Sequence, residues 1–156
     1  MINFKKPMTP NQEKLINLAK KLVGVPYKYG AKITEAPEVF DCSGLIKYLY
    51  QQIGIDIPRS TIEQAEFAGR EIKNIRGIQP GDLIFFKSSR GHYNSTFPKG
   101  VGHAVMYLGD NEVIHAKSKR VQHNPKIIEE GKVKTETFEE AMEELKPLVI
   151  IKRIIK

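Results

Sequence analysis

The pattern of hydrophobic and polar residues changes midway along the chain. In the first half, apolar positions recur every three or four residues, which predicts helices over residues 10–23, 43–53 and 61–68. Residues that favour helix N-caps precede these segments: Thr9, Asp41 and Ser60. Glycines follow them: Gly24, Gly54 and Gly69. We therefore expect three N-terminal helices with defined ends.

The second half of the chain has the pattern of strands. Short apolar or alternating segments predict strands over residues 82–86, 103–108, 112–116 and 148–155. The segment beginning at Thr137 predicts one more helix, which crosses to the last strand. Because helices precede the sheet, the expected fold class is α+β. The length fits a single domain over residues 1–156.

Two irregular segments separate these elements. Residues 25–40 are rich in proline, glycine and β-branched residues and lead to the second helix. Residues 87–100 form a long polar loop, typical of segments that border a cleft. His92 in this loop and His123 in a later polar segment are expected to be solvated surface residues.

Composition and charge limit the possible classes of protein. The chain is 40% hydrophobic and 28% charged, as in a folded globular protein. Its net charge of +7 suits polyanionic surroundings such as an acidic cell wall, but the basic residues are scattered, and no nucleic-acid partner is expected. No segment approaches the roughly 18 consecutive apolar residues of a membrane span, so an integral membrane protein is not expected. The start of the chain lacks the pattern of a secretory signal, and localisation stays open.

Cys42, the only cysteine, stands at the predicted start of the second helix. A lone cysteine excludes an intramolecular disulfide, and no metal-ligand spacing is present. A helix N-terminus stabilises negative charge and so favours the thiolate, the nucleophilic form. The alternative is an inert, buried apolar residue. A nucleophilic thiol needs a nearby imidazole base, which itself needs a partner to orient it.

His103 and His115 are the candidate imidazoles, one on each of two predicted strands joined by a short turn. A two-residue loop would point them to opposite faces of the sheet. A three-residue loop pairs Leu108 with Glu112 and brings both imidazoles to one face, and we predict this register. The same alternation is expected to direct the two histidines and Val105 toward the cysteine helix.

The chain resembles the NlpC-type cell-wall peptidases, a papain-like cysteine peptidase family, in five segments that occur in the family's order. These are VPYKYG (residues 25–30), DCSGLI (41–46), IPRSTIEQ (57–64), QPGDLIFF (79–86) and GHAVMYLGDNEVIHA (102–116). Together they cover about residues 13–117, and the combination is specific although each segment alone is weak. The resemblance implies a papain-like fold, with N-terminal helices packed on a central antiparallel sheet, and neither a metal nor an organic cofactor.

The resemblance also implies a role for each matching residue. Cys42 would be the nucleophile, His103 the general base and His115 the residue that orients the base. Four further residues match substrate-binding or oxyanion positions: Tyr27, Asp41, Ser43 and Arg59. Three of them could instead have structural roles only: Asp41 as a helix cap, Ser43 as a residue of the first helical turn and Arg59 in a loop ion pair.

The implied activity is hydrolysis of the γ-D-glutamyl-diamino acid bond in peptidoglycan stem peptides, by a monomer whose partner is peptidoglycan or a muropeptide. One alternative is an N-acetylmuramoyl-L-alanine amidase of related papain-like type. A lipid acyltransferase or deacylase with similar parts generally places its histidines before the cysteine, whereas Cys42 comes first here. A non-catalytic wall-binding module is the remaining alternative, and such a module has no need of the complete Cys/His/His set.

Overall fold

A computed structural model describes residues 6–88 and 91–155 of the chain. Its α-helices are α1 (Pro10–Lys21), α2 (Cys42–Gln52), α3 (Thr61–Phe67) and α4 (Phe138–Leu145). Its strands are β1 (Arg70–Glu71), β2 (Leu83–Phe86), β3 (His103–Gly109), β4 (Glu112–Gln122), β5 (Ile128–Thr137) and β6 (Leu148–Arg153). Two 3₁₀ turns are η1 (Ile33–Glu35) and η2 (Ile75–Gly77).

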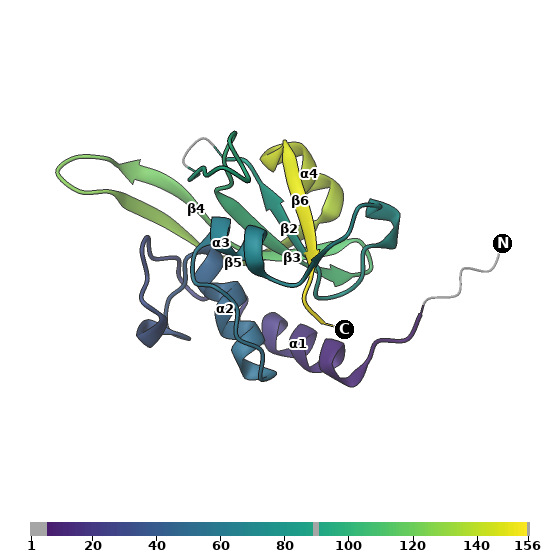
Figure 1. Cartoon of the computed structure of the whole chain (residues 1–156). Helices are drawn as coiled ribbons and strands as arrows, with labels where there is room; N and C mark the ends of the chain where they lie inside the picture. The colour runs from purple at the N-terminus through teal and green to yellow at the C-terminus, as the bar shows by residue number, and fades with distance from the viewer. Residues whose placement is uncertain (1–5, 89–90, 156) are drawn as a thin grey trace.

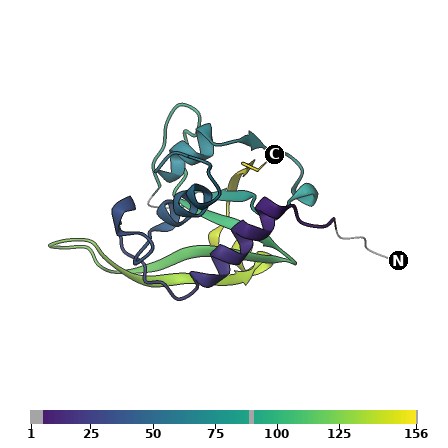
Figure 2. The same ribbon diagram turned by 90° about the horizontal axis from the view of Figure 1, so that it is seen from below.

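Within the described residues, the six strands form one antiparallel sheet in the order β1–β6–β2–β3–β4–β5. Helices α1 and α2 cover one face of the sheet and α4 lies on the other (Figures 1 and 2). The expected α+β class and antiparallel sheet are therefore confirmed. No helix in the described part of the chain is long and apolar enough to cross a membrane.

The predicted helices begin where their caps indicated. The Thr9 side chain accepts a hydrogen bond from the Gln12 N–H, and the Gln12 side chain accepts one from the Thr9 N–H, which completes the capping box of α1. Asp41 caps α2 through the Gly44 N–H at 2.8 Å. Thr137 caps α4 in the same way as Thr9 caps α1. These ends were predictable because capping depends on residues close in sequence.

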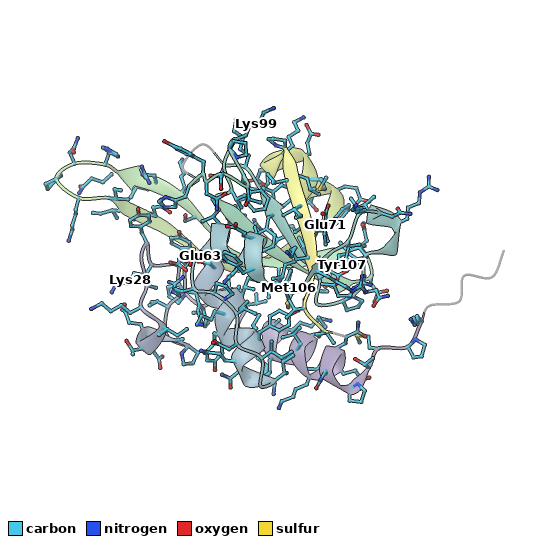
Figure 3. All side chains as sticks on the ribbon, viewed as in Figure 1. Lys28, Glu63, Glu71, Lys99, Met106 and Tyr107 are labelled. Carbon is cyan, nitrogen blue, oxygen red and sulfur yellow. The ribbon has the colours of Figure 1, made fainter. Side chains whose placement is uncertain are left out.

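Alternation along β3 and β4 divides the core into two layers. Ala104 and Met106 pack with the apolar faces of α1 and α2. Val105 and Val113 pack on the opposite face with Ala141 of α4. Met106 lies in the interior of the molecule, as Figure 3 shows. The expected assignment of faces is therefore wrong: Val105 lies on the face that α4 covers, and by the same alternation so do His103 and His115. Alternation groups residues by face but does not say which helix covers that face.

The turn between β3 and β4 differs from the predicted one. It has two central residues, Asp110 and Asn111, with φ of 50° and 64°, the left-handed values that a type I′ turn requires. Gly109 pairs with Glu112, so the predicted pairing of Leu108 with Glu112 is wrong.

A bulge between Tyr107 and Gly109 nevertheless restores the predicted register further along the strands. The bulge leaves Leu108 as the extra residue, and Tyr107 then pairs with Val113. Met106 pairs with Ile114 in the same register. His103 and His115 consequently lie on one face of the sheet, as predicted, although the reason is a bulge rather than a longer loop.

Strand β5 was missed by the sequence analysis, and β4 extends well past its predicted end at residue 116. Together the two strands form a long hairpin whose tip projects beyond the rest of the molecule (Figure 1). The segment KVKTET at the end of β5 alternates charged with smaller residues, a strand signal that its high polarity obscured.

Candidate active site

Cys42 is the first residue of α2, as predicted, and its side chain is buried. Its sulfur lies 3.5 Å from the Thr61 hydroxyl oxygen. It also receives a hydrogen bond from the backbone N–H of Ala104, the residue that follows His103. The start of α2 therefore sits directly against the start of β3.

Burial raises the pKa of the Cys42 thiol, and the nearby Asp41 carboxylate raises it further. Hydrogen bonds from the Thr61 hydroxyl and the backbone N–H groups of Ala104 and Ser43 act in the opposite direction, but burial is the largest effect. The thiol is therefore protonated at neutral pH, and it needs a base in order to become a nucleophile.

His103 and His115 form a hydrogen-bonded pair. The Nε2 atom of His103 lies 2.8 Å from the Nδ1 atom of His115, and the two rings meet edge to face. His115 is fully buried. His103 lines a cavity of about 380 Å³, together with Cys42 and Tyr27. The structure therefore brings together the three residues that the sequence analysis selected.

A buried carboxylate lies beside His115. The Glu136 Oε2 atom is 2.5 Å from the Nε2 atom of His115, and the Glu136 side chain is 6% exposed. Burial and the Lys117 and Lys134 ammonium groups lower the pKa of His115 from its usual value to about 3. The Glu144 carboxylate acts in the opposite direction, but burial is the largest effect. His115 is therefore neutral. The same two lysines also pair with Glu136. Glu136 was missed because strand β5 was missed.

Tyr27 is also linked by hydrogen bonds to polar side chains of the β4–β5 hairpin. Its hydroxyl is hydrogen-bonded to Ser118, and the Ser118 hydroxyl donates to Glu129, another β5 carboxylate. Since a serine hydroxyl has one proton, the Tyr27 hydroxyl donates to Ser118. Burial raises the pKa of Tyr27, and the negative charges of Glu129 and of Cys42, which is ionised at the high pH where a tyrosine titrates, raise it further. Sequence reasoning found Tyr27 but neither partner in the β4–β5 hairpin.

Asp41, Ser43 and Arg59 form one cluster on another side of Cys42. The Arg59 guanidinium donates to Asp41 Oδ2 at 2.8 Å and to the Ser43 hydroxyl at 2.8 Å. It also donates to the backbone carbonyl of Ala31. The three residues line a second cavity, of about 600 Å³, which shares Cys42 and Tyr27 with the first. Both structural readings of Asp41 and Arg59, the helix cap and the ion pair, are observed.

The two cavities differ in their remaining walls. The first is bounded by the β4–β5 hairpin and α4, with a mixture of basic and acidic side chains: Lys117, Arg120, Lys146, Glu129 and Glu144. The second is bounded by residues 29–33, the start of α3, and His92. The two cavities therefore meet at Cys42 and Tyr27. His92 is exposed, as predicted, and it lines the second cavity. Ser89 and Arg90 of the same loop lie outside the described residues.

The described residues lack the clustered ligands of a metal site. Among residues 6–88 and 91–155, no group of three or more histidine, cysteine, aspartate or glutamate side chains is placed to hold a metal ion. The described side chains place a thiol and an imidazole in the walls of one cavity, and the partner of that imidazole is buried and hydrogen-bonded.

The model of the NlpC/P60 family matches residues 24–142, which is most of the chain. The chain belongs to the NlpC/P60 family. The NlpC/P60 match includes Cys42, both histidines and Glu136. The gamma-DL-glutamyl hydrolase of Bacillus subtilis is 37% identical over 103 residues, and the gamma-D-glutamyl-L-lysine dipeptidyl-peptidase of Bacillus cereus is 36% identical over 121 residues. The matches cover 65% and 77% of this chain but only 22% and 32% of those relatives.

Solved NlpC/P60 structures have the same fold. NlpC1 from Trichomonas vaginalis superposes with a TM-score of 0.70 at 28% identity and covers 96% of this chain and 46% of its own. The family protein from Bacillus cereus gives a TM-score of 0.70 at 27% identity, over 96% of this chain and 42% of its own. RipD from Mycobacterium tuberculosis, described as a non-catalytic NlpC/p60 domain protein, shares the fold with a TM-score of 0.64 at 20% identity, over 95% of this chain and 100% of its own. Family membership therefore establishes the fold and a relationship to peptidoglycan endopeptidases.

Proposed function

We propose that this chain is a cysteine endopeptidase that cleaves the γ-D-glutamyl-diamino acid bond of peptidoglycan stem peptides. The observation that carries the proposal is the hydrogen-bonded pair of His103 and His115, with His103 lining the same cavity as the Cys42 thiol. The relatives named for γ-glutamyl bonds support the choice of bond.

The first half of the reaction forms an acyl-enzyme. His103 accepts the thiol proton of Cys42 at Nδ1, the ring nitrogen that does not face His115. The thiolate attacks the γ-carbonyl carbon of the D-glutamyl residue and forms a tetrahedral intermediate. When the intermediate collapses, the carbon–nitrogen bond breaks and the diamino acid leaves as an amine, with the proton that His103 carried.

The second half releases the acyl group. A water molecule gives its proton to His103 and attacks the thioester carbonyl. The second tetrahedral intermediate expels Cys42, which takes the proton back from His103 as a thiol, and the γ-carboxyl group of D-glutamate is released. Throughout, the backbone N–H of Cys42 and the hydroxyl of Tyr27 are the proposed donors to the negatively charged carbonyl oxygen.

The cavities suggest how the substrate lies. In this proposal, the cavity with Asp41 and Arg59 accepts the peptide on the acyl side, where the Asp41 carboxylate binds its free amino end. The cavity beside the hairpin and α4 accepts the leaving diamino acid, whose amine and carboxylate groups suit its mixed acidic and basic walls.

Product analysis tests the proposal. Wild-type protein and Cys42→Ala are incubated with purified peptidoglycan and with a free L-Ala-γ-D-Glu-diaminopimelate peptide, and products are identified by mass spectrometry. We expect cleavage after D-glutamate by the wild type only. Cleavage between the muramoyl group and L-alanine would instead identify an amidase.

The alternative of a non-catalytic binding module is favoured by one comparison, the shared fold with RipD. The same experiment distinguishes it. A folded wild-type protein that cosediments with peptidoglycan, cleaves neither substrate and behaves identically with Ala at position 42 would be a wall-binding module.

A further inference from the structure

Glu136 contacts the second histidine of the pair through the ring nitrogen that does not face His103. The Glu136 Oε2 atom lies 2.5 Å from His115 Nε2, and His115 Nδ1 lies 2.8 Å from His103 Nε2. The three side chains come from β5, β4 and β3, which are adjacent strands of the sheet. They form one continuous chain of hydrogen bonds that ends at the cavity containing Cys42.

Two ammonium groups pair with the Glu136 carboxylate. Lys117 of β4 and Lys134 of β5 approach its second oxygen, Oε1, at 3.6 and 3.7 Å. Glu144 of α4 faces Lys117 and forms an ion pair with it. An ionised carboxylate only accepts hydrogen bonds, so the proton between Glu136 and His115 is carried by His115 Nε2.

The position of this proton also determines which histidine carries the proton between His115 Nδ1 and His103 Nε2. His115 is neutral in its buried setting, so a proton on Nε2 leaves a lone pair on Nδ1. His115 Nδ1 must then accept from the Nε2–H of His103. Before the reaction, neutral His103 consequently has its lone pair on Nδ1, the nitrogen that the proposed mechanism uses as the base.

We propose that Glu136 is a positioning residue that sets the direction of this chain of hydrogen bonds and thereby holds His103 in the tautomer that can accept the Cys42 proton. The inference rests on the proposed function of Cys42 and His103. When the thiol attacks, one proton moves, from the Cys42 sulfur to His103 Nδ1, and the later transfers to the amine and from water use the same nitrogen. The protons on His103 Nε2 and His115 Nε2 stay in place, and Glu136 receives none.

Glu136→Gln reverses the chain in this proposal. Lys117 and Lys134 attract the carbonyl oxygen of the new amide, so its NH₂ group faces His115 and donates to Nε2. His115 must then carry its proton on Nδ1 and donate to His103 Nε2. His103 in turn carries its proton on Nδ1 and is blocked as a base, although the variant side chain has almost the same shape.

Nuclear magnetic resonance of protein with ¹⁵N-labelled histidine tests the direction of the bonds without any substrate. We expect His103 and His115 of the wild type both to be protonated on Nε2, and both to be protonated on Nδ1 in Glu136→Gln. A wild-type spectrum with the proton of His115 on Nδ1 would overturn the proposal, whether or not the variant folds.

Activity provides the second readout. Glu136→Gln should lower kcat on the stem peptide by roughly 10² or more, as expected for a base held in the wrong tautomer, with little change in KM. Glu130→Gln is the matched control, because Glu130 is an exposed carboxylate on the same strand, and it should keep full activity. Unchanged tautomers and unchanged kcat in Glu136→Gln would refute the positioning role. Wild-type protein with the expected tautomers but no cleavage would refute the proposed function alone.

Discussion

Arg59 donates a hydrogen bond to Asp41 Oδ2 at 2.8 Å, while Asp41 Oδ1 accepts one from the Gly44 N–H at 2.8 Å. One carboxylate therefore caps α2 and anchors the guanidinium that reaches across the second cavity. This double use means that a test of substrate binding by Asp41 must preserve the cap.

Asp41→Asn is suited to that test, because asparagine is as good an N-cap as aspartate. If Asp41 binds the free amino end of the substrate, the variant loses a charge-assisted bond, and kcat/KM for the free peptide should fall by about 10-fold to 10²-fold. An N-acetylated peptide should show little difference between the two proteins. Asp56→Asn, at an exposed ion pair, is the control. An equal loss on both peptides would indicate a structural role only.

The Cys42 thiol should depend on His103 for its reactivity. Burial raises the pKa of Cys42, so little of the thiol is ionised at pH 7. Alkylation by iodoacetamide should therefore accelerate as a higher pH increases the thiolate fraction. At pH 7, His103→Gln should slow alkylation by roughly 10² or more, since the imidazole is the base. His123→Gln, at an exposed histidine, should react as the wild type does. Mass spectrometry follows the reaction, and equal rates in all three proteins would contradict the assignment of His103.

Tyr27→Phe tests the proposed oxyanion donor. Loss of the hydroxyl should lower kcat by about 10²-fold and leave KM nearly unchanged, because the hydrogen bond forms with the charged intermediate. In the free protein the Tyr27 proton points to Ser118, so the hydroxyl must rotate when substrate binds. Tyr93→Phe, at an exposed tyrosine, serves as the control in the same steady-state assay. An increase in KM with kcat preserved would assign Tyr27 to ground-state binding instead.

His115 should make the protein sensitive to acid. Its pKa is about 3 in the folded protein and about 6.5 when unfolded, so between these values the unfolded state binds the extra proton. Stability should therefore decrease as the pH falls from 6.5 toward 3, by up to about 1.4 kcal/mol per pH unit from this residue. Urea unfolding at several pH values, with His115→Gln for comparison, measures the effect. Parallel pH profiles for the two proteins would show that His115 is not held neutral.

The sequence by itself determined the features that depend on neighbours along the chain. The starts of α1, α2 and α4 follow from Thr9, Asp41 and Thr137, whose side chains bond to backbone groups three residues away. The position of Cys42 at a helix start follows in the same way. The shared face of His103 and His115 was also predicted, but from a three-residue loop, whereas a bulge at Leu108 produces it.

Only the tertiary structure decided the strand register, the packing of the sheet faces and the partners of the buried polar side chains. The bulge at Leu108, the packing of Val105 against α4 and the pairing of β5 with β4 arise between segments distant in sequence. Strand β5 is rich in charged residues at the edge of the sheet, so its sequence lacks a clear apolar signal. Yet this strand contributes the carboxylates of Glu129 and Glu136 behind Tyr27 and His115. A buried polar side chain needs a partner, but which distant residue supplies it depends on the register of the folded sheet.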